Sequence, residues 1–255
     1  MRINMKTILS ALLFSTLCFN TFSRSDYGEA FEIVLLEHYD TQAHLYHIQD
    51  ESNHSQCLWI GVHGINDSPK KILTLKSLYQ NCAHKVLAYD DQTSRLGPIS
   101  NILKEELKSL INKYENIYID GHSMGARISL HALNNLDPQS SSIKINLLSP
   151  HLIGLKSSNI ARTAIWPFSL IPKVNPGKDM ASASRFQKEL NSITLSPKVN
   201  ISIYSGGKDW QINHQSNEFR DFTEKINADW KHFPQEDHNS IIVRFFKHKI
   251  SEKTF

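Results

Sequence analysis

Short apolar runs alternate with helix-like patterns along most of this 255-residue chain, and this alternation constrains the fold more than any other feature. Each run has the length of a buried or half-buried strand. Strands that alternate with helices form parallel β-α-β units, with helices on both faces of one sheet. The runs interpreted as strands are Phe31–Glu37, His44–Ile48, Cys57–Val62, Val86–Tyr89, Asn116–Asp120, Ile143–Leu148, Val199–Tyr204 and Asp229–Phe233. The first two are predicted to form an antiparallel hairpin, and the sequence as a whole indicates one α/β domain over residues 24–255.

Two helices and one long insertion complete this picture. Apolar residues recur at helical spacing between Ile99 and Tyr114, and Ile241–Ile250 is typical of a closing helix. The stretch 153–198, after the sixth strand, is too long for an ordinary connection and contains Pro167, Pro172 and Pro176. We therefore predict a partly helical lid or cap insertion that lies over the carboxyl ends of the strands.

The N-terminal residues 1–23 are typical of a secretory signal peptide. Arg2 and Lys6 precede an apolar run that is too short to span a bilayer comfortably, and small residues before Arg24 suit cleavage. Cys18 permits a lipoprotein alternative, but Leu17 is too large for the residue that lipoprotein processing prefers. We expect export to the periplasm or the extracellular space. Removal of residues 1–23 lowers the formal net charge from +3 to +1, which gives no electrostatic argument for binding nucleic acid.

The two remaining cysteines, Cys57 and Cys82, each precede a predicted strand. If these strands are parallel neighbours, both thiols lie at the same edge of the sheet. An oxidising compartment would permit a disulfide, which stabilises a protein by about 3 kcal/mol. The sequence supports a disulfide and two free thiols equally.

The candidate nucleophile is Ser123, within Gly121–Gly125 (GHSMG). A Gly-x-Ser-x-Gly pattern alone is weak evidence, but here a predicted strand leads into it and a helix leaves it. That context is typical of a nucleophile elbow, in which a tight turn presents the serine above the sheet. Side chains in place of either glycine would collide with their neighbours. The alternative is a serine that caps an ordinary helix.

A serine nucleophile needs a histidine base and an acid that orients the base. Asp209 follows the seventh strand and a pair of glycines, so we predict that it is the acid, although it can also be an ordinary turn residue. His238 lies in a polar loop before the closing helix and is the predicted base. The weaker candidates are Asp179, interpreted as a helix-surface charge, Asp237, His214, interpreted as too near Asp209 in sequence to reach across, His232 and His122.

Backbone N–H groups must stabilise the oxyanion that forms during attack. The first predicted donor is Met124, directly after the nucleophile. The second is Ile65, in the loop after the third strand, where Gly64 lets the backbone turn inward and His63 can brace the loop. The alternative is an ordinary strand-to-helix loop.

Together these segments resemble the α/β-hydrolase superfamily, in its esterase and lipase branch. The matching segments are Trp59–Gly64, Gly121–Gly125, Gly207–Asp209 and Asp237–His238. The resemblance implies a mostly parallel eight-stranded sheet with an antiparallel second strand, and catalysis through an acyl-enzyme without a metal or cofactor. The chain departs from many relatives after the fourth strand and in the Gly125–Ala126 pair, which leaves the subfamily and the substrate open.

The predicted activity is hydrolysis of a carboxylic ester, either small or lipid, with transient contact to a lipid surface possible for a lipid substrate. Ala164–Pro172 can line an acyl pocket, form a lid or pack onto the domain. Alternatives within the fold are a thioesterase and an amide-cleaving peptidase, because leaving-group preference depends on the pocket. A binding protein that keeps the fold without catalysis is the alternative from another class. The candidate substrate contacts are His63, His122, Trp166, Phe168 and Trp210.

Overall fold

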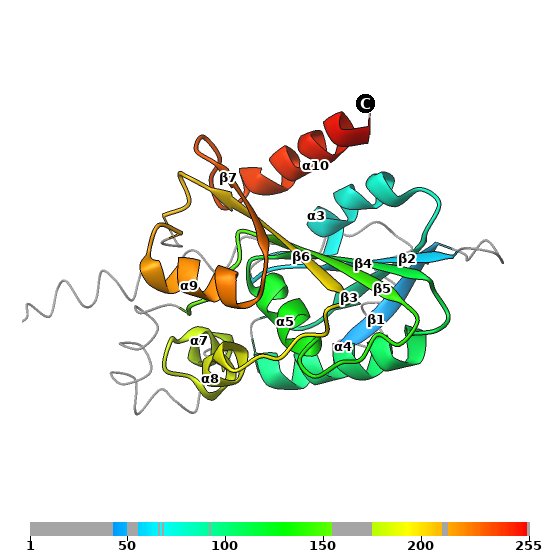
Figure 1. The fold of residues 1–255 in the computed structure, drawn as a ribbon, viewed down its shortest axis with the longest axis horizontal. Helices are drawn as coiled ribbons and strands as arrows, with labels where there is room; N and C mark the ends of the chain where they lie inside the picture. Colours follow the sequence, from blue (N-terminus) through cyan, green and yellow to red (C-terminus); the bar gives the residue numbers. More distant parts are fainter. Residues whose placement is uncertain are drawn as a thin grey trace, which may run out of the picture. The chain divides into compact units, whose positions relative to one another are not determined.

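The computed structural model describes residues 43–49, 56–65, 67, 69–91, 93–154, 175–210 and 214–253. They form one sheet with helices on both faces (Figure 1). The strands are β1 (His44–Gln49), β2 (Cys57–Val62), β3 (Ala83–Ala88), β4 (Asn116–His122), β5 (Ser142–Leu148), β6 (Val199–Gly206) and β7 (Asp229–Phe233). Their order in the sheet is β1-β3-β2-β4-β5-β6-β7.

Only β1 runs antiparallel to its neighbour; every other described pair is parallel. The predicted mostly parallel sheet and its order of elements are therefore confirmed. The predicted first strand, Phe31–Glu37, lies outside the described residues, so the predicted number of eight strands is not tested. β3 begins at Ala83, earlier than the predicted Val86, because the polar His84 and Lys85 are buried between two neighbouring strands.

Helices cover both faces of the sheet (Figure 1). On one face lie α4 (Leu96–Leu110), α5 (Met124–Ala132) and α9 (Asn217–Lys225). On the other lie α3 (Pro69–Leu73), which continues as the 3-10 helix η2 (Thr74–Tyr79), and α10 (Ser240–Lys253). The predicted helices at Ile99–Tyr114 and Ile241–Ile250 are both present, although α4 already ends at Leu110. Within the described residues, no helix combines the length and apolar character needed to cross a membrane.

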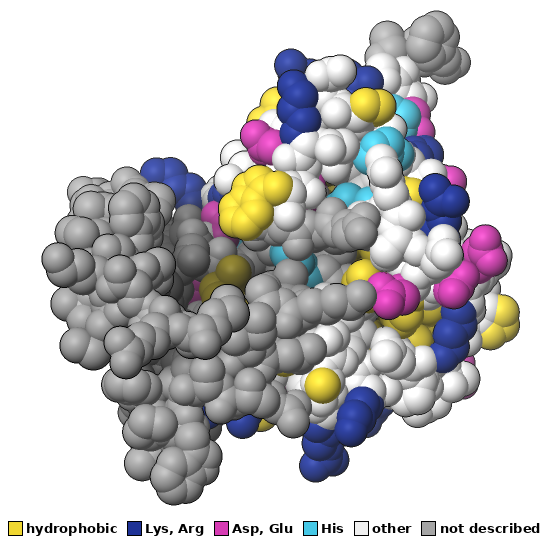
Figure 2. All heavy atoms as spheres, turned by 90° about the vertical axis from the view of Figure 1, so that its left-hand side faces the viewer, with side chains coloured by type: hydrophobic (Ala, Val, Ile, Leu, Met, Phe, Trp, Pro, Cys, Tyr) yellow, Lys and Arg dark blue, Asp and Glu magenta, His cyan; other side chains and the backbone are white. Residues whose placement is uncertain are grey.

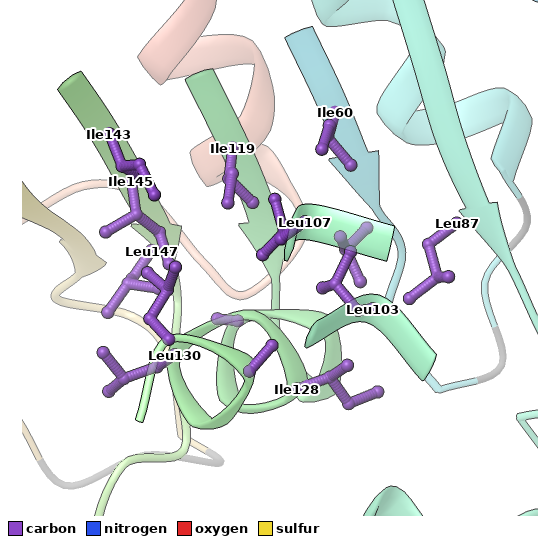
Figure 3. Packing of buried hydrophobic residues seen from close by; sticks show 14 of the residues in the cluster. Ile60, Leu87, Leu103, Leu107, Ile119, Ile128, Leu130, Ile143, Ile145 and Leu147 are labelled. Atoms are coloured by element: carbon purple, nitrogen blue, oxygen red, sulfur yellow. The ribbon is translucent and has the colours of Figure 1, made fainter. Parts of the chain in front are cut away.

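The main core lies between the sheet and the helices α4 and α5 (Figure 3). Ile60, Ile119 and Ile145 from neighbouring strands face Leu107 and Ile128 from the helices, and all five are at most 1% exposed. Burial of a side chain of this size stabilises the fold by about 1.5–3 kcal/mol. This core therefore fixes the position of the sheet edge at which β4 meets α5.

The described part of the insertion packs against the helices beside the sheet. It contains α7 (Asn175–Met180) and α8 (Arg185–Asn191), which contact α4 and α5. The fully buried Arg127 of α5 donates hydrogen bonds to the carbonyl oxygens of Asp179 and Met180 and to Gln187 Oε1. Burial lowers the pKa of Arg127 to about 9. The insertion is thus partly helical, as predicted, but these two helices lie on one face of the sheet.

Asp179 is not the surface charge that was predicted. Its carboxylate is buried, accepts a hydrogen bond from the backbone N–H of Leu96 at 2.9 Å, and pairs with Arg95 at 2.6 Å. Leu96 is the first residue of α4, where backbone N–H groups have no partner within the helix. Asp179 therefore stabilises the start of α4, and the prediction missed this because the two segments are far apart in sequence.

Cys57 and Cys82 form a disulfide, with their Cα atoms 4.7 Å apart. Leu58 of β2 is in register with Ala83 of β3, so the cysteines stand side by side, one position earlier on each chain. Of the two alternatives that the sequence left open, the structure contains the disulfide.

Candidate active site

Ser123 lies in a sharp turn between β4 and α5. Its backbone has φ 53° and ψ −117°, a conformation that side chains rarely adopt and that costs about 1–3 kcal/mol. Its side chain makes no hydrogen bond that caps α5, so the alternative of an ordinary capping serine is not supported. Added Cβ atoms would lie 2.7 Å from Ala126 Cα at Gly121 and 2.2 Å from the His63 carbonyl oxygen at Gly125. Both glycines are therefore needed for the close approach of strand and helix.

The structure brings together the three residues that the sequence proposed as a triad. His238 Nε2 is 2.8 Å from Ser123 Oγ, and His238 Nδ1 is 2.8 Å from Asp209 Oδ2. Each of the three residues is buried. In this arrangement Nδ1–H donates to the carboxylate, which leaves Nε2 free to accept the serine proton. The geometry is that of an activated nucleophile.

The carboxylate of Asp209 remains charged although it is buried. Burial by itself would raise its pKa, but the imidazoles of His214 and His238 and the hydroxyl of Ser149 outweigh this effect and lower the pKa below its usual range. His214 Nε2 lies 3.8 Å from Asp209 Oδ2, so the prediction that His214 was too near in sequence to reach this site needs correction. His238, however, is the histidine that reaches Ser123.

Two other weaker candidates, Asp237 and His232, have hydrogen-bond partners other than Ser123. Asp237 accepts hydrogen bonds from the backbone N–H groups of Asn239 and Ser240, so it shapes the loop around His238. His232 Nδ1 is 2.9 Å from the hydroxyl of Ser205. Both side chains have structural partners away from the nucleophile.

The predicted oxyanion loop lies directly against Ser123. A Cβ atom added at Gly64 would lie 3.0 Å from Ser123 Cβ, so a larger residue here would crowd the serine. Ile65 follows Gly64 and is half-buried, and Met124 is fully buried at the start of α5. Met124 is therefore next to Ser123 in sequence, and Ile65 directly follows the glycine that lies against Ser123.

His63 braces that loop. Its ring stacks on Tyr89 with the centroids 4.2 Å apart, and its Nδ1–H donates to the Gly64 carbonyl oxygen at 2.9 Å. Tyr89 in turn donates to the His63 carbonyl oxygen. Burial lowers the pKa of His63 to about 4, so the ring is neutral near pH 7. The placement agrees with a bracing role more closely than with the predicted substrate contact.

The remaining predicted substrate contacts have different positions. Trp210 directly follows Asp209 and is 87% exposed, so its indole is open to a ligand. His122 is 2% exposed and both of its ring nitrogens face protein groups, so this structure does not support its predicted substrate contact. Trp166 and Phe168 lie outside the described residues.

Two residues near the triad were missed by the sequence analysis. Ser149 and His151 directly follow β5 and are buried. The ring of His151 lies 5.2 Å from that of His238, and on another flank the ring of His122 lies 5.1 Å away. Burial lowers the pKa of both flanking rings. Their position along the chain was the signal that could have found them. The carboxyl ends of β4, β5 and β6 lie at one edge of the sheet, so residues that follow β5 lie near those that follow β4 and β6.

The abundance of histidine raises the question of a metal centre. Among the residues that the structure describes, no group of three or more His, Cys, Asp or Glu side chains is arranged to hold a metal ion. On the face shown in Figure 2, basic and acidic side chains are interspersed and histidines are visible at several points. Near Ser123, the rings of His63, His122 and His238 form hydrogen bonds with protein groups, as described above.

Comparison with known proteins identifies the fold. No family model matches the chain, and no curated protein matches it in sequence. Solved structures do match. A lipase-esterase related protein from Clostridium acetobutylicum ATCC 824 has a TM-score of 0.55 at 14% identity, over 84% of this chain and 100% of that one. The lipase BlEst2 of Bacillus licheniformis, in its mature form, has a TM-score of 0.56 at 13% identity, over 83% and 97%. This chain has the α/β-hydrolase fold.

Another match within the α/β-hydrolase fold bears a different name. It is a deformylase from Pseudomonas putida S16, with a TM-score of 0.53 at 16% identity, over 82% of this chain and 95% of that one. At such low identities the likeness establishes the fold alone. Function has to be argued from the site itself, because one fold serves many reactions.

Proposed function

We propose that this protein is a serine hydrolase that cleaves carboxylic esters. The observation that carries the proposal is the continuous hydrogen-bonded chain from Ser123 Oγ through His238 to Asp209, with both links at 2.8 Å. A strained turn holds the serine in place, and strain of this kind persists where function requires it. A binding protein without catalysis would not need this complete series of hydrogen bonds between Ser123, His238 and Asp209.

In the proposed reaction, His238 Nε2 takes the proton of Ser123 as the hydroxyl oxygen attacks the ester carbonyl carbon. The backbone N–H groups of Ile65 and Met124 stabilise the oxyanion. The intermediate collapses, His238 gives its proton to the leaving alcohol, and an acyl-enzyme remains. The same imidazole then deprotonates a water molecule that attacks the acyl carbonyl; the bond to Ser123 Oγ breaks, His238 returns the proton to that oxygen, and the acid leaves. Asp209 stays ionised and stabilises the imidazolium, in agreement with its lowered pKa.

The neutral state of the flanking histidines supports this cycle. An imidazolium forms on His238 in each half of the reaction. Burial lowers the pKa of His122 and of His151, so neither ring adds a positive charge beside it near pH 7. The site can therefore accept one proton without repulsion from its nearest rings.

The ester preference is supported by the names of the fold neighbours, among them a lipase and a lipase-esterase related protein. Because one fold neighbour is a deformylase, amide cleavage is a second candidate function. Thioesters are the third class of substrate to test. The exposed Trp210 beside the acid offers an apolar surface for an acyl chain or a lipid. We propose that residues 1–23 direct export and are then removed, and the Cys57–Cys82 disulfide is in keeping with an oxidising compartment.

A substrate panel tests the proposal. Acetyl, butyryl, octanoyl and palmitoyl groups would each be offered as the ester, the thioester and the amide, to the wild type and to Ser123→Ala. We expect ester turnover that the variant lacks, with a preferred chain length. Amide turnover that exceeds ester turnover would contradict the ester assignment, and equal turnover by both proteins would contradict the role of the serine.

A further inference from the structure

His122 links the nucleophile turn to the loop that carries the base. It directly precedes Ser123, and its Nε2 lies 2.8 Å from the backbone carbonyl oxygen of His238. Since a carbonyl oxygen only accepts, Nε2 carries the proton and donates. The ring is almost completely buried, so water competes little for this hydrogen bond.

The other side of the His122 ring faces the oxyanion loop. Its Nδ1 lies 3.3 Å from Asp67 Oδ2. The pKa of Asp67 is lowered, and the ammonium of Lys71 beside it favours the charged carboxylate. One buried ring thus stands between the loop before α3 and the loop before α10.

Lys71 of α3 makes a second connection between the same two loops. Its ammonium lies 3.2 Å from Asp67 Oδ2 and donates a 2.7 Å hydrogen bond to Asn239 Oδ1. Asn239 is the residue after the base. The loop around His238 is therefore held from two directions, through its own carbonyl and through its neighbour's side chain.

We propose that His122, together with Lys71, is a positioning residue that sets the direction of the catalytic imidazole; the inference rests on the proposed function. The carbonyl of residue 238 and its side chain branch from the same Cα atom. Fixing that carbonyl limits rotation of the backbone, and so limits where Nε2 stands relative to Ser123 Oγ. His122 makes no contact with substrate in this role. Its effect is on the rate of proton transfer, because misplacement of a catalytic group by about 1 Å can cost about 100-fold in rate.

The test compares two substitutions of His122. In His122→Gln the side-chain amide can still donate to the carbonyl of residue 238, whereas in His122→Leu no donor remains. His131→Leu is the matched control. His131 is also a buried histidine on the same strand-helix unit, but its partners are Ser100 and Glu189, away from the triad. Each protein would be assayed for kcat and KM on p-nitrophenyl acetate, for the rate at which a small fluorophosphonate labels Ser123, and for its Tm.

We expect His122→Leu to lower both kcat and the labelling rate by about 10–100-fold with KM nearly unchanged. His122→Gln is expected to recover most of this loss, and His131→Leu to label at the wild-type rate even if its Tm falls. Wild-type labelling by a folded His122→Leu, or equal losses in the Gln and Leu variants, would overturn the inference. Failure of the wild type itself to label would instead overturn the proposed function.

Lys71→Met provides a second arm if His122→Leu does not fold. Lys71 is partly exposed, so its loss should be tolerated by the fold. The expected effect has the same direction and is smaller, about 3–10-fold in kcat, because the carbonyl link through His122 remains. A wild-type kcat in Lys71→Met would contradict the proposed role of Lys71 in holding the loop around His238.

Discussion

The backbone of Ser123 leads to a prediction about stability that does not depend on any substrate. At φ 53° and ψ −117° an L-residue is strained, but the mirror image of this conformation lies in the ordinary extended region, so glycine adopts it without strain. We compare Ser123→Gly with Ser123→Ala. Both lack the hydroxyl, so the loss of the hydrogen bond to His238 cancels.

The magnitude follows from three contributions. In a buried, unstrained position, alanine to glycine costs about 0.4–1 kcal/mol through the unfolded chain and about 0.8 kcal/mol for the lost methyl group, or about 1.5 kcal/mol together. Relief of backbone strain at position 123 returns about 1–3 kcal/mol. We therefore expect Ser123→Gly to be about 0.5 kcal/mol more stable than Ser123→Ala.

Ala132→Gly supplies the control. Ala132 is fully buried at the end of α5, the helix that follows Ser123, and has regular helical backbone, so glycine there should cost about 1.5 kcal/mol. The two alanine-to-glycine steps should differ by about 2 kcal/mol, or about 4–8 °C in Tm for a chain of this size. Urea unfolding and calorimetry measure both. If glycine costs as much at position 123 as at position 132, the turn at the serine stores no strain and the reasoning is refuted.

Three further predictions concern the acid, the disulfide and the pH dependence of stability. Asp209→Asn should lower kcat by about 10⁴-fold while Tm changes little, because an amide does not hold the histidine in the required tautomer; steady-state kinetics would show this, and a loss under 10-fold would contradict the role of the acid. Replacing Cys57 and Cys82 with serine should lower the free energy of unfolding by about 3 kcal/mol in urea titrations, and a loss under 1 kcal/mol would argue against the disulfide as a stabilising link. The pKa of His63 falls from 6.5 to about 4 on folding, so the unfolded chain takes up a proton first and stability is lost as the pH falls from about 6.5 to 4, by up to about 3 kcal/mol. Asp120, whose pKa burial raises to about 6, acts in the opposite direction in this range, so the readout is the difference between wild type and His63→Phe; identical slopes for the two proteins would refute the assignment to His63.

The alternation of apolar runs and helix patterns was enough to predict the sheet, because strands buried on both faces leave continuous apolar segments. It misplaced the start of β3, where His84 and Lys85 interrupt the apolar run yet are buried and pair with β1 on one side and β2 on the other. It also misjudged Asp179, since the partner that explains this carboxylate is the start of α4, 83 residues earlier. Local patterns carry no information about such distant partners.

The candidate site was predictable for a related reason. Parallel strands end at one edge, so Ser123 after β4 and Asp209 after β6 could be placed near each other from chain order alone. The histidines around them could not be sorted in this way. His122 and His63 stand next to functional positions in sequence, but their roles depend on hydrogen bonds to His238 and Gly64 that only the folded backbone reveals.

The central claim is that Ser123 is a nucleophile activated by His238, and covalent labelling tests it most directly. The folded wild type, Ser123→Ala and His238→Gln would each be incubated with a small fluorophosphonate, and the modified peptide identified by mass spectrometry. We predict one added phosphonyl group on Ser123 in the wild type, none on the alanine variant and labelling slowed by at least about 100-fold in the glutamine variant. A folded wild type that stays unmodified, or that carries the group on another residue, would contradict the account.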